Sequence, residues 1–151
     1  MQKKSISLFI SIVLVKIVFV LIIVCCIAAP WLVRAYDGEY VLAAGQDSVY
    51  MPLLVTLYCA AVPATLLIIA LDRLLANISR GDAFIKRNVM WLRIISYCCF
   101  AESVIFIYFG FLRHFAFLVV IAAAFFGLIL RVIKNVFEQA IALREENDFT
   151  I

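Results

Sequence analysis

Two ionisable side chains, Lys16 and Glu102, lie well inside long apolar stretches, where a charge can do chemistry or orient a helix. At 1.5 Å per residue, each lies roughly 13–16 Å from the end of its stretch. Unpaired charges at such depth are costly, and such residues usually face neighbouring helices and find partners. We therefore predict a Lys16–Glu102 ion pair between the first and third helices. The alternatives are an ion, proton or ligand site, or two side chains that reach the headgroups separately.

The five cysteines are the next candidates for chemistry, and all lie in apolar stretches. Adjacent cysteines rarely pair with each other, and no histidine accompanies any of them. We interpret them as small apolar packing residues, with a redox or metal role as the alternative. The residues concerned are Cys25, Cys26, Cys59, Cys98 and Cys99.

Recognisable catalytic and ligand-binding motifs are missing from the sequence. It contains no P-loop, no H-E-x-x-H, no G-x-S-x-G and no paired-cysteine zinc spacing. The single histidine, His114, is interpreted as an interfacial side chain. We therefore predict no catalytic residue, no cofactor and no metal, and a protein that is not an enzyme. The net charge of +3 is too modest to indicate binding of nucleic acid.

Composition sets the environment in which these residues must be positioned. The chain has 151 residues and is 68% hydrophobic, whereas soluble domains are about 45–50% apolar. A soluble fold of this size cannot bury that much apolar surface, and what stayed exposed would aggregate. The sequence therefore predicts an all-α integral membrane protein, a four-helix bundle forming one transmembrane domain over residues 1–151.

Apolar runs and polar breaks divide this domain into four spans. The first run is longer than the 7–15 apolar residues usual in a signal peptide, the competing interpretation, so we predict a retained helix. The predicted spans are 6–30, 51–75, 84–112 and 115–136, with an outer loop at 31–50, a cytoplasmic hinge at 76–83 and a cytoplasmic tail at 137–151.

Particular residues mark helix ends, a bend and close contacts. Pro63 is predicted to kink the second span and to free a carbonyl that a neighbour must satisfy. Gly81 is predicted to end that helix, and Asp82 to cap the next. Small residues four apart, Ala60 with Ala64 and Ala123 with Gly127, favour close helix contacts.

Basic residues concentrate before the first span, around the hinge and after the fourth span, as at Lys3, Lys86 and Arg144. By the positive-inside rule, both termini face the cytoplasm. The third and fourth helices exceed the roughly 20 residues that a span needs. We therefore predict amphipathic extensions over 84–93 and 132–143 that form a cytoplasmic collar. Its basic hinge and acidic tail indicate internal pairing with attraction to lipid headgroups, or a docking surface for a soluble partner.

Two segments carry a family resemblance. The hinge, Arg80-Gly81-Asp82-Ala83-Phe84-Ile85-Lys86-Arg87-Asn88-Val89-Met90-Trp91-Leu92-Arg93-Ile94, and the closing residues Glu145-Glu146-Asn147-Asp148-Phe149-Thr150-Ile151 resemble the YoaS-like family of bacterial membrane proteins of unknown function. The sequence departs from that pattern at Ala83, Ser96 and Ala140, where Pro or Gly is common. Genes of this family commonly neighbour a small helix-turn-helix regulator, so the resemblance implies a membrane protein that binds or sequesters such a regulator.

The resulting hypothesis is a non-enzymatic regulator or scaffold in the bacterial inner membrane. Its partners would be membrane lipids and a cytoplasmic helix-turn-helix regulator, and a homo-oligomer stays open. The alternatives are a small-molecule or ion carrier that uses Lys16, Glu102 and the Pro63 kink, and an accessory subunit of a larger membrane complex. The predicted partner-binding residues are Arg80, Gly81, Phe84, Asn88, Arg93, Glu145, Glu146, Asn147 and Asp148.

Overall fold

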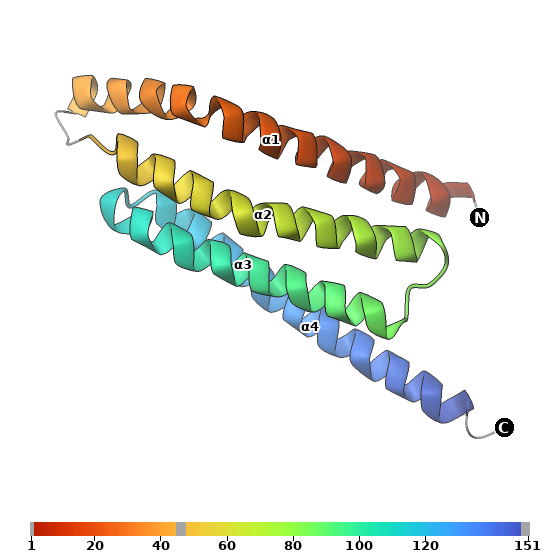
Figure 1. Ribbon diagram of the computed structural model, residues 1–151. Helices are drawn as coiled ribbons and strands as arrows, with labels where there is room; N and C mark the ends of the chain where they lie inside the picture. Colours follow the sequence, from red (N-terminus) through yellow and green to blue (C-terminus); the bar gives the residue numbers. More distant parts are fainter. Residues whose placement is uncertain (1, 45–47, 149–151) are drawn as a thin grey trace.

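The computed structural model describes residues 2–44 and 48–148, and within them the chain forms four helices (Figure 1). They are α1 (Gln2–Ala44), α2 (Tyr50–Ser79), α3 (Lys86–Leu112) and α4 (Ala116–Asp148). Each is long and apolar enough to cross a membrane. The prediction of an all-α chain with four apolar helices is confirmed.

The four helices pack in chain order. Among the described residues, α1 packs on α2, α2 on α3, and α3 on α4, and no other pair of helices approaches closely. The arrangement is therefore an open row, in which α1 and α4 are the outer members, rather than a bundle that closes on itself. This differs from the predicted four-helix bundle, because α2 and α3 lie between α1 and α4 (Figure 1).

Helix α1 is longer than predicted, because it continues through Pro30 into the segment predicted as an outer loop. A proline inside a helix removes the N–H that would bond the carbonyl four residues earlier, here that of Cys26. The hydroxyl of Tyr58 on α2 donates a hydrogen bond of 3.1 Å to that carbonyl. Val33, beyond the proline, is only 2% exposed. Compensation from α2 and burial on it explain why α1 does not end at Pro30.

The connection from α1 to α2 is tied by Asp37. Its carboxylate accepts hydrogen bonds from the Ser48 hydroxyl at 2.6 Å and from the Val49 backbone N–H at 2.7 Å. Val49 is the residue before α2, where unbonded N–H groups and the helix dipole favour a negative charge. Asp37, predicted as a loop residue, instead stabilises the beginning of α2 from within α1.

The hinge between α2 and α3 spans residues 80–85. Gly81 has a φ of 91°. Its backbone N–H donates to the carbonyl of Ile78, and the backbone N–H of Asp82 donates to the carbonyl of Asn77. These are the two hydrogen bonds of a Schellman motif, which needs a residue with positive φ. Gly81 therefore ends α2 as predicted. The prediction for Asp82 is wrong: Ile85 precedes α3, and no side chain caps that helix.

Helices α3 and α4 form a tight hairpin. The hydroxyls of Ser96 and Ser103 donate to the backbone carbonyls of Gly127 and Val120, at 2.8 and 3.1 Å. A Cβ at Gly127 would lie only 3.2 Å from the ring of Phe100. Gly127, a small residue predicted to favour a close helix contact, therefore leaves the space that the Phe100 ring of α3 occupies.

Large apolar side chains cover much of the outer surface. Phe9, Ile27, Trp31 and Phe115 are between 68% and 84% exposed. Water does not tolerate so extensive an apolar surface, whereas hydrocarbon does. The apolar surface and the length of the helices together indicate a multi-pass membrane protein.

The fold brings polar segments to one end of the row. Figure 1 shows the beginning of α1, the α2–α3 hinge and the end of α4 at the same end, which we call the hinge end. The end of α1, the beginning of α2 and the turn at 113–115 lie at the opposite end, the turn end. The assignment of the hinge end to the cytoplasm stays a prediction from charge.

Candidate functional site

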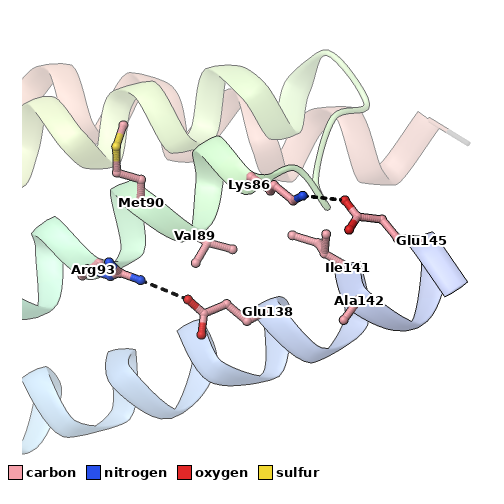
Figure 2. Close-up of a pocket in the computed structure, with 8 residues that line it drawn as sticks. All are labelled: Lys86, Val89, Met90, Arg93, Glu138, Ile141, Ala142 and Glu145. Carbon is pink, nitrogen blue, oxygen red and sulfur yellow. Dashed lines mark hydrogen bonds and ion pairs between the residues drawn. The ribbon is translucent and has the colours of Figure 1, made fainter.

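The strongest candidate site is a groove between α3 and α4 at the hinge end, which we call the α3–α4 groove (Figure 2). It has a volume of about 440 Å³. Val89 and Ile141 are buried, at 6% and 8% exposure, and form its apolar floor. The lining residues are Lys86, Val89, Met90, Arg93, Glu138, Ile141, Ala142 and Glu145.

Ion pairs cross the rim of this groove. Lys86 pairs with Glu145 at 2.8 Å, and Arg93 pairs with Glu138 at 3.1 Å, each joining α3 to α4 (Figure 2). Lys134 adds a third contact to Glu138, at 2.9 Å within α4. The basic residues of the first turns of α3 and the acidic residues of the last turns of α4 therefore pair with each other. Internal pairing is one of the two alternatives that the charge pattern left open. The pairs are partly exposed, so each contributes modestly to stability.

An aromatic contact extends the same surface toward the hinge. The rings of Phe84 and Phe137 lie 5.1 Å apart, tilted by 32°. Phe84 is nevertheless 49% exposed. It therefore offers half of its ring as apolar surface beside the groove.

Asn88 holds the hinge in place rather than facing a partner. It is completely buried, and its amide donates to the carbonyls of Asp82 and Ala83 at 2.7 and 2.8 Å. Its carbonyl accepts from the side chain of Asn77 at 2.7 Å. All three bonds link the beginning of α3 to the hinge or to the end of α2. The role of Asn77 could not be predicted from the sequence, because nothing in its local sequence marks it as the partner of Asn88.

The other predicted partner-binding residues lie at the end of α2 and in the last turn of α4. Arg80 is exposed, and its backbone N–H bonds the carbonyls of Ala76 and Asn77. Glu146 and Asn147 are exposed on the last turn of α4. Asp148 is the last residue of that helix, and the residues after it lie outside the described chain.

A second cavity, of about 390 Å³, surrounds Glu102. It is lined mainly by apolar residues of α1 and α2, including Tyr58, Ala60 and Ala64, and Glu102 reaches it from α3. Glu102 shares the lining of this cavity with Ala64, the residue directly after Pro63. Pro63 is itself buried, and the residues on both sides of it belong to α2.

Lys16 lies elsewhere, so the structure does not bring the two intramembrane charges together. Lys16 is exposed and lines a separate cavity between α1 and α2, with Asp72 and Arg73. It forms no ion pair with Glu102, because α1 packs on α2 and α2 separates it from α3. The two residues also lie beside different parts of α2, because Lys16 shares its cavity with Ile68 to Arg73, whereas Glu102 shares its cavity with Leu57 to Ala64.

The cysteines and possible metal ligands give no second site. All five cysteines are free, and Cys98 and Cys99 are buried while Cys25 and Cys59 are exposed. No group of three or more His, Cys, Asp or Glu residues with the geometry of a metal site occurs within the described ranges. Their placement fits packing on neighbouring helices or in lipid.

One family model matches most of the chain. It is described as a protein of unknown function (DUF2975), and the match covers residues 37–151. The chain belongs to this family. The DUF2975 match includes the hinge, α3, α4 and the closing residues, and thus the whole α3–α4 groove. No curated protein and no solved structure matches the chain.

Proposed function

We propose that this DUF2975 protein is a non-enzymatic membrane regulator or scaffold that binds a cytoplasmic protein in the α3–α4 groove. The observation that carries the proposal is the groove itself, an apolar floor between two rows of charge. Such a floor with a charged rim fits one amphipathic helix, whose apolar side chains fill the groove while its polar side chains meet the rim.

The lengths of α3 and α4 support placing the groove beyond the membrane. Helix α4 has 33 residues and α3 has 27, or about 50 and 40 Å at 1.5 Å per residue. A hydrocarbon core is about 30 Å thick. If the turn end lies at one surface of the bilayer, about 20 Å of α4 and 10 Å of α3 project from the other. These projecting parts contain the groove, and the positive-inside rule assigns them to the cytoplasm of a bacterial cell.

The resemblance to YoaS-like proteins supplies the class of partner. It implies a small helix-turn-helix regulator, which is itself helical and can offer an amphipathic helix. Binding would hold such a regulator at the membrane, away from its operator. In this proposal Phe84 and the exposed rim residues contact the partner, and Asn88 and Gly81 keep α3 in position.

The test is co-purification of the full-length protein, in mild detergent, with the helix-turn-helix regulator encoded beside it. Ala142→Arg puts a long cation into the groove, and Leu143→Arg makes the same charge change on the neighbouring residue, which does not line it. We expect the amount of co-purified regulator to fall about tenfold in Ala142→Arg and to stay unchanged in Leu143→Arg. Removal of residues 144–151, which takes Glu145 from the rim, is expected to weaken binding as well. No co-purification with the wild-type protein, or equal losses in both arginine variants, would contradict the proposal.

A carrier is the second candidate, and the cavity around Glu102 favours it. A carboxyl in an otherwise apolar cavity beside a proline in a helix is typical of sites that bind a cation or proton within membranes. A flux of cations or protons across the membrane of proteoliposomes that disappears in Glu102→Gln would establish this function. Undiminished flux in that variant, or no flux in the wild-type protein, would exclude Glu102 as the site of transport.

A further inference from the structure

A third cavity lies on the flank of the α3–α4 hairpin and is lined by cations. It has a volume of about 250 Å³ and is formed by Arg93, Ser96, Tyr97, Arg131 and Lys134. We call it the flank cavity. Arg93 and Tyr97 stand four residues apart on α3, and Arg131 and Lys134 three apart on α4, so each pair shares a helix face.

The positive charges of the flank cavity exceed the negative charges that pair with them in the part of the chain that the structure describes. Arg93, Arg131 and Lys134 contribute three cations, and within residues 2–44 and 48–148 Glu138 is the one carboxylate that pairs with any of them. Arg131 and Tyr97 are exposed. The Arg131 guanidinium and the Tyr97 hydroxyl have no ion pair or hydrogen bond to any residue in the described ranges. Lys134 is only 15% exposed, so its charge is partly removed from water. An excess of positive charge in such a place favours an anion.

The position of the cavity along the hairpin identifies the source of the anion. Tyr97 and Arg131 each lie 15 residues from the turn end of their helices, Leu112 and Ala116. That separation is about 22 Å, and Arg93 and Lys134 lie about 28 and 27 Å from the same ends. A hydrocarbon core is about 30 Å thick. If the turn end lies at one surface of the bilayer, the cavity lies near the opposite edge of the hydrocarbon, close to the level of the lipid phosphates.

The surface below the cavity suits acyl chains. On α3, Val104 and Tyr108 follow Tyr97 at helical spacing and are 67% and 59% exposed; on α4, Leu128 precedes Arg131 by three residues and is 56% exposed. These side chains lead from the cavity toward the turn end, through the depth at which lipid tails lie.

We propose that the flank cavity binds the phosphate of an anionic phospholipid from the leaflet at the hinge end. Arg131 and Arg93 offer guanidinium groups to the phosphate oxygens, Lys134 adds a point charge, and the Tyr97 hydroxyl donates a hydrogen bond. The Ser96 hydroxyl already bonds Gly127 and forms the wall. The site differs from the α3–α4 groove, with which it shares Arg93 alone.

The test measures retained lipid on the full-length protein by native mass spectrometry. Phosphatidylglycerol and phosphatidylcholine with the same acyl chains are added separately in nonionic detergent. Arg131→Gln removes one cation of the site, and Arg144→Gln removes an exposed cation of α4 outside it. Arg131→Lys keeps the charge, and a third arm adds inorganic phosphate at the concentration of the lipid.

We expect the wild-type protein to retain phosphatidylglycerol in preference to phosphatidylcholine. Arg131→Gln should weaken that retention about tenfold, the scale of one charge-assisted contact, while Arg144→Gln leaves it unchanged and Arg131→Lys recovers part of it. Equal retention of the two lipids, or equal losses in the two glutamine variants, would overturn the proposal. Displacement of the lipid by equimolar inorganic phosphate would overturn the assignment to a lipid.

Discussion

Replacing Asn88 is expected to destabilise the hinge far more than its single polar side chain suggests. Asn88→Ala removes three hydrogen bonds of 2.7–2.8 Å at a position with no exposed surface. A typical hydrogen bond contributes about 1 kcal/mol net. We therefore expect the free energy of unfolding to fall by about 3 kcal/mol, at the upper end of usual single substitutions.

Asn88→Asp gives a sharper form of the same prediction. It keeps the size of the side chain but replaces the amide nitrogen with an oxygen, opposite the carbonyls of Asp82 and Ala83. Two attractions become repulsions, and a buried charge is left without a cation. This variant should therefore be at least as unstable as Asn88→Ala, although it loses no volume.

The assay is equilibrium unfolding in mixed micelles of mild detergent and SDS. Trp91 packs against the apolar cluster of Ala70, Leu74, Leu92 and Ile95 at the hinge end, so its fluorescence reports unfolding there. Trp31→Phe removes the other tryptophan, which is 84% exposed. Asn147→Ala, an exposed asparagine, is the control and should change little.

Substituting Asn77, a hydrogen-bond partner of Asn88, allows the contributions of the individual hydrogen bonds to be separated. Asn77→Ala removes one of the three bonds and should cost about 1 kcal/mol. In the double variant the cost of losing that bond should be counted only once, since the two residues share it. A loss below about 0.5 kcal/mol in Asn88→Ala would refute the reasoning that this side chain fixes the hinge.

Two further predictions concern contacts between helices and use the same unfolding assay. Tyr58→Phe removes the hydroxyl that bonds the Cys26 carbonyl and should cost about 0.6 kcal/mol, the average for such bonds in membranes. In a Pro30→Ala background, where the backbone supplies the missing N–H, the cost should nearly vanish; an equal cost in both backgrounds would show that the hydroxyl does not compensate for the proline. Gly127→Leu should cost about 1–3 kcal/mol, the range for overpacked cores, because the new side chain forces the Phe100 ring aside. Leu128→Ile, at an exposed position, should be neutral. A stable Gly127→Leu protein would mean that α3 and α4 need not approach so closely.

Composition and spacing were sufficient to predict the number and type of the elements. Four apolar runs predict four helices, because hydrocarbon requires each backbone to satisfy its own hydrogen bonds. The Gly81 stop could also be predicted, since its signal is local. Pairing between the basic residues near the hinge and the acidic tail was one of the two interpretations that the charge pattern allowed, and the Lys86–Glu145 and Arg93–Glu138 ion pairs are an example of it.

Features that depend on which helices are neighbours could not be predicted. Pro30 is a sound stop signal in isolation, but Tyr58 on the adjacent helix offsets the lost hydrogen bond. Lys16 and Glu102 do not share an interface, because within the described residues α1 packs on α2 and not on α3. They also lie beside different parts of α2. The flank cavity could not be predicted either, because the sequence does not show which faces of α3 and α4 pack together. Without that knowledge, nothing indicates that Arg131 lies beside Arg93.

The most direct test of the account is the side of the membrane on which the hinge end lies. Single cysteines at Asp82 and Ala142, at the hinge end, and at Glu39, in the last turns of α1, would be introduced into a protein whose native cysteines are replaced by alanine. A thiol reagent that cannot cross membranes would be applied to intact spheroplasts and to inverted vesicles. We predict that the cysteines at 82 and 142 react only in inverted vesicles and that the cysteine at 39 reacts only in spheroplasts. Labelling of 82 and 142 from opposite sides, or of both in intact spheroplasts, would contradict the proposed cytoplasmic groove.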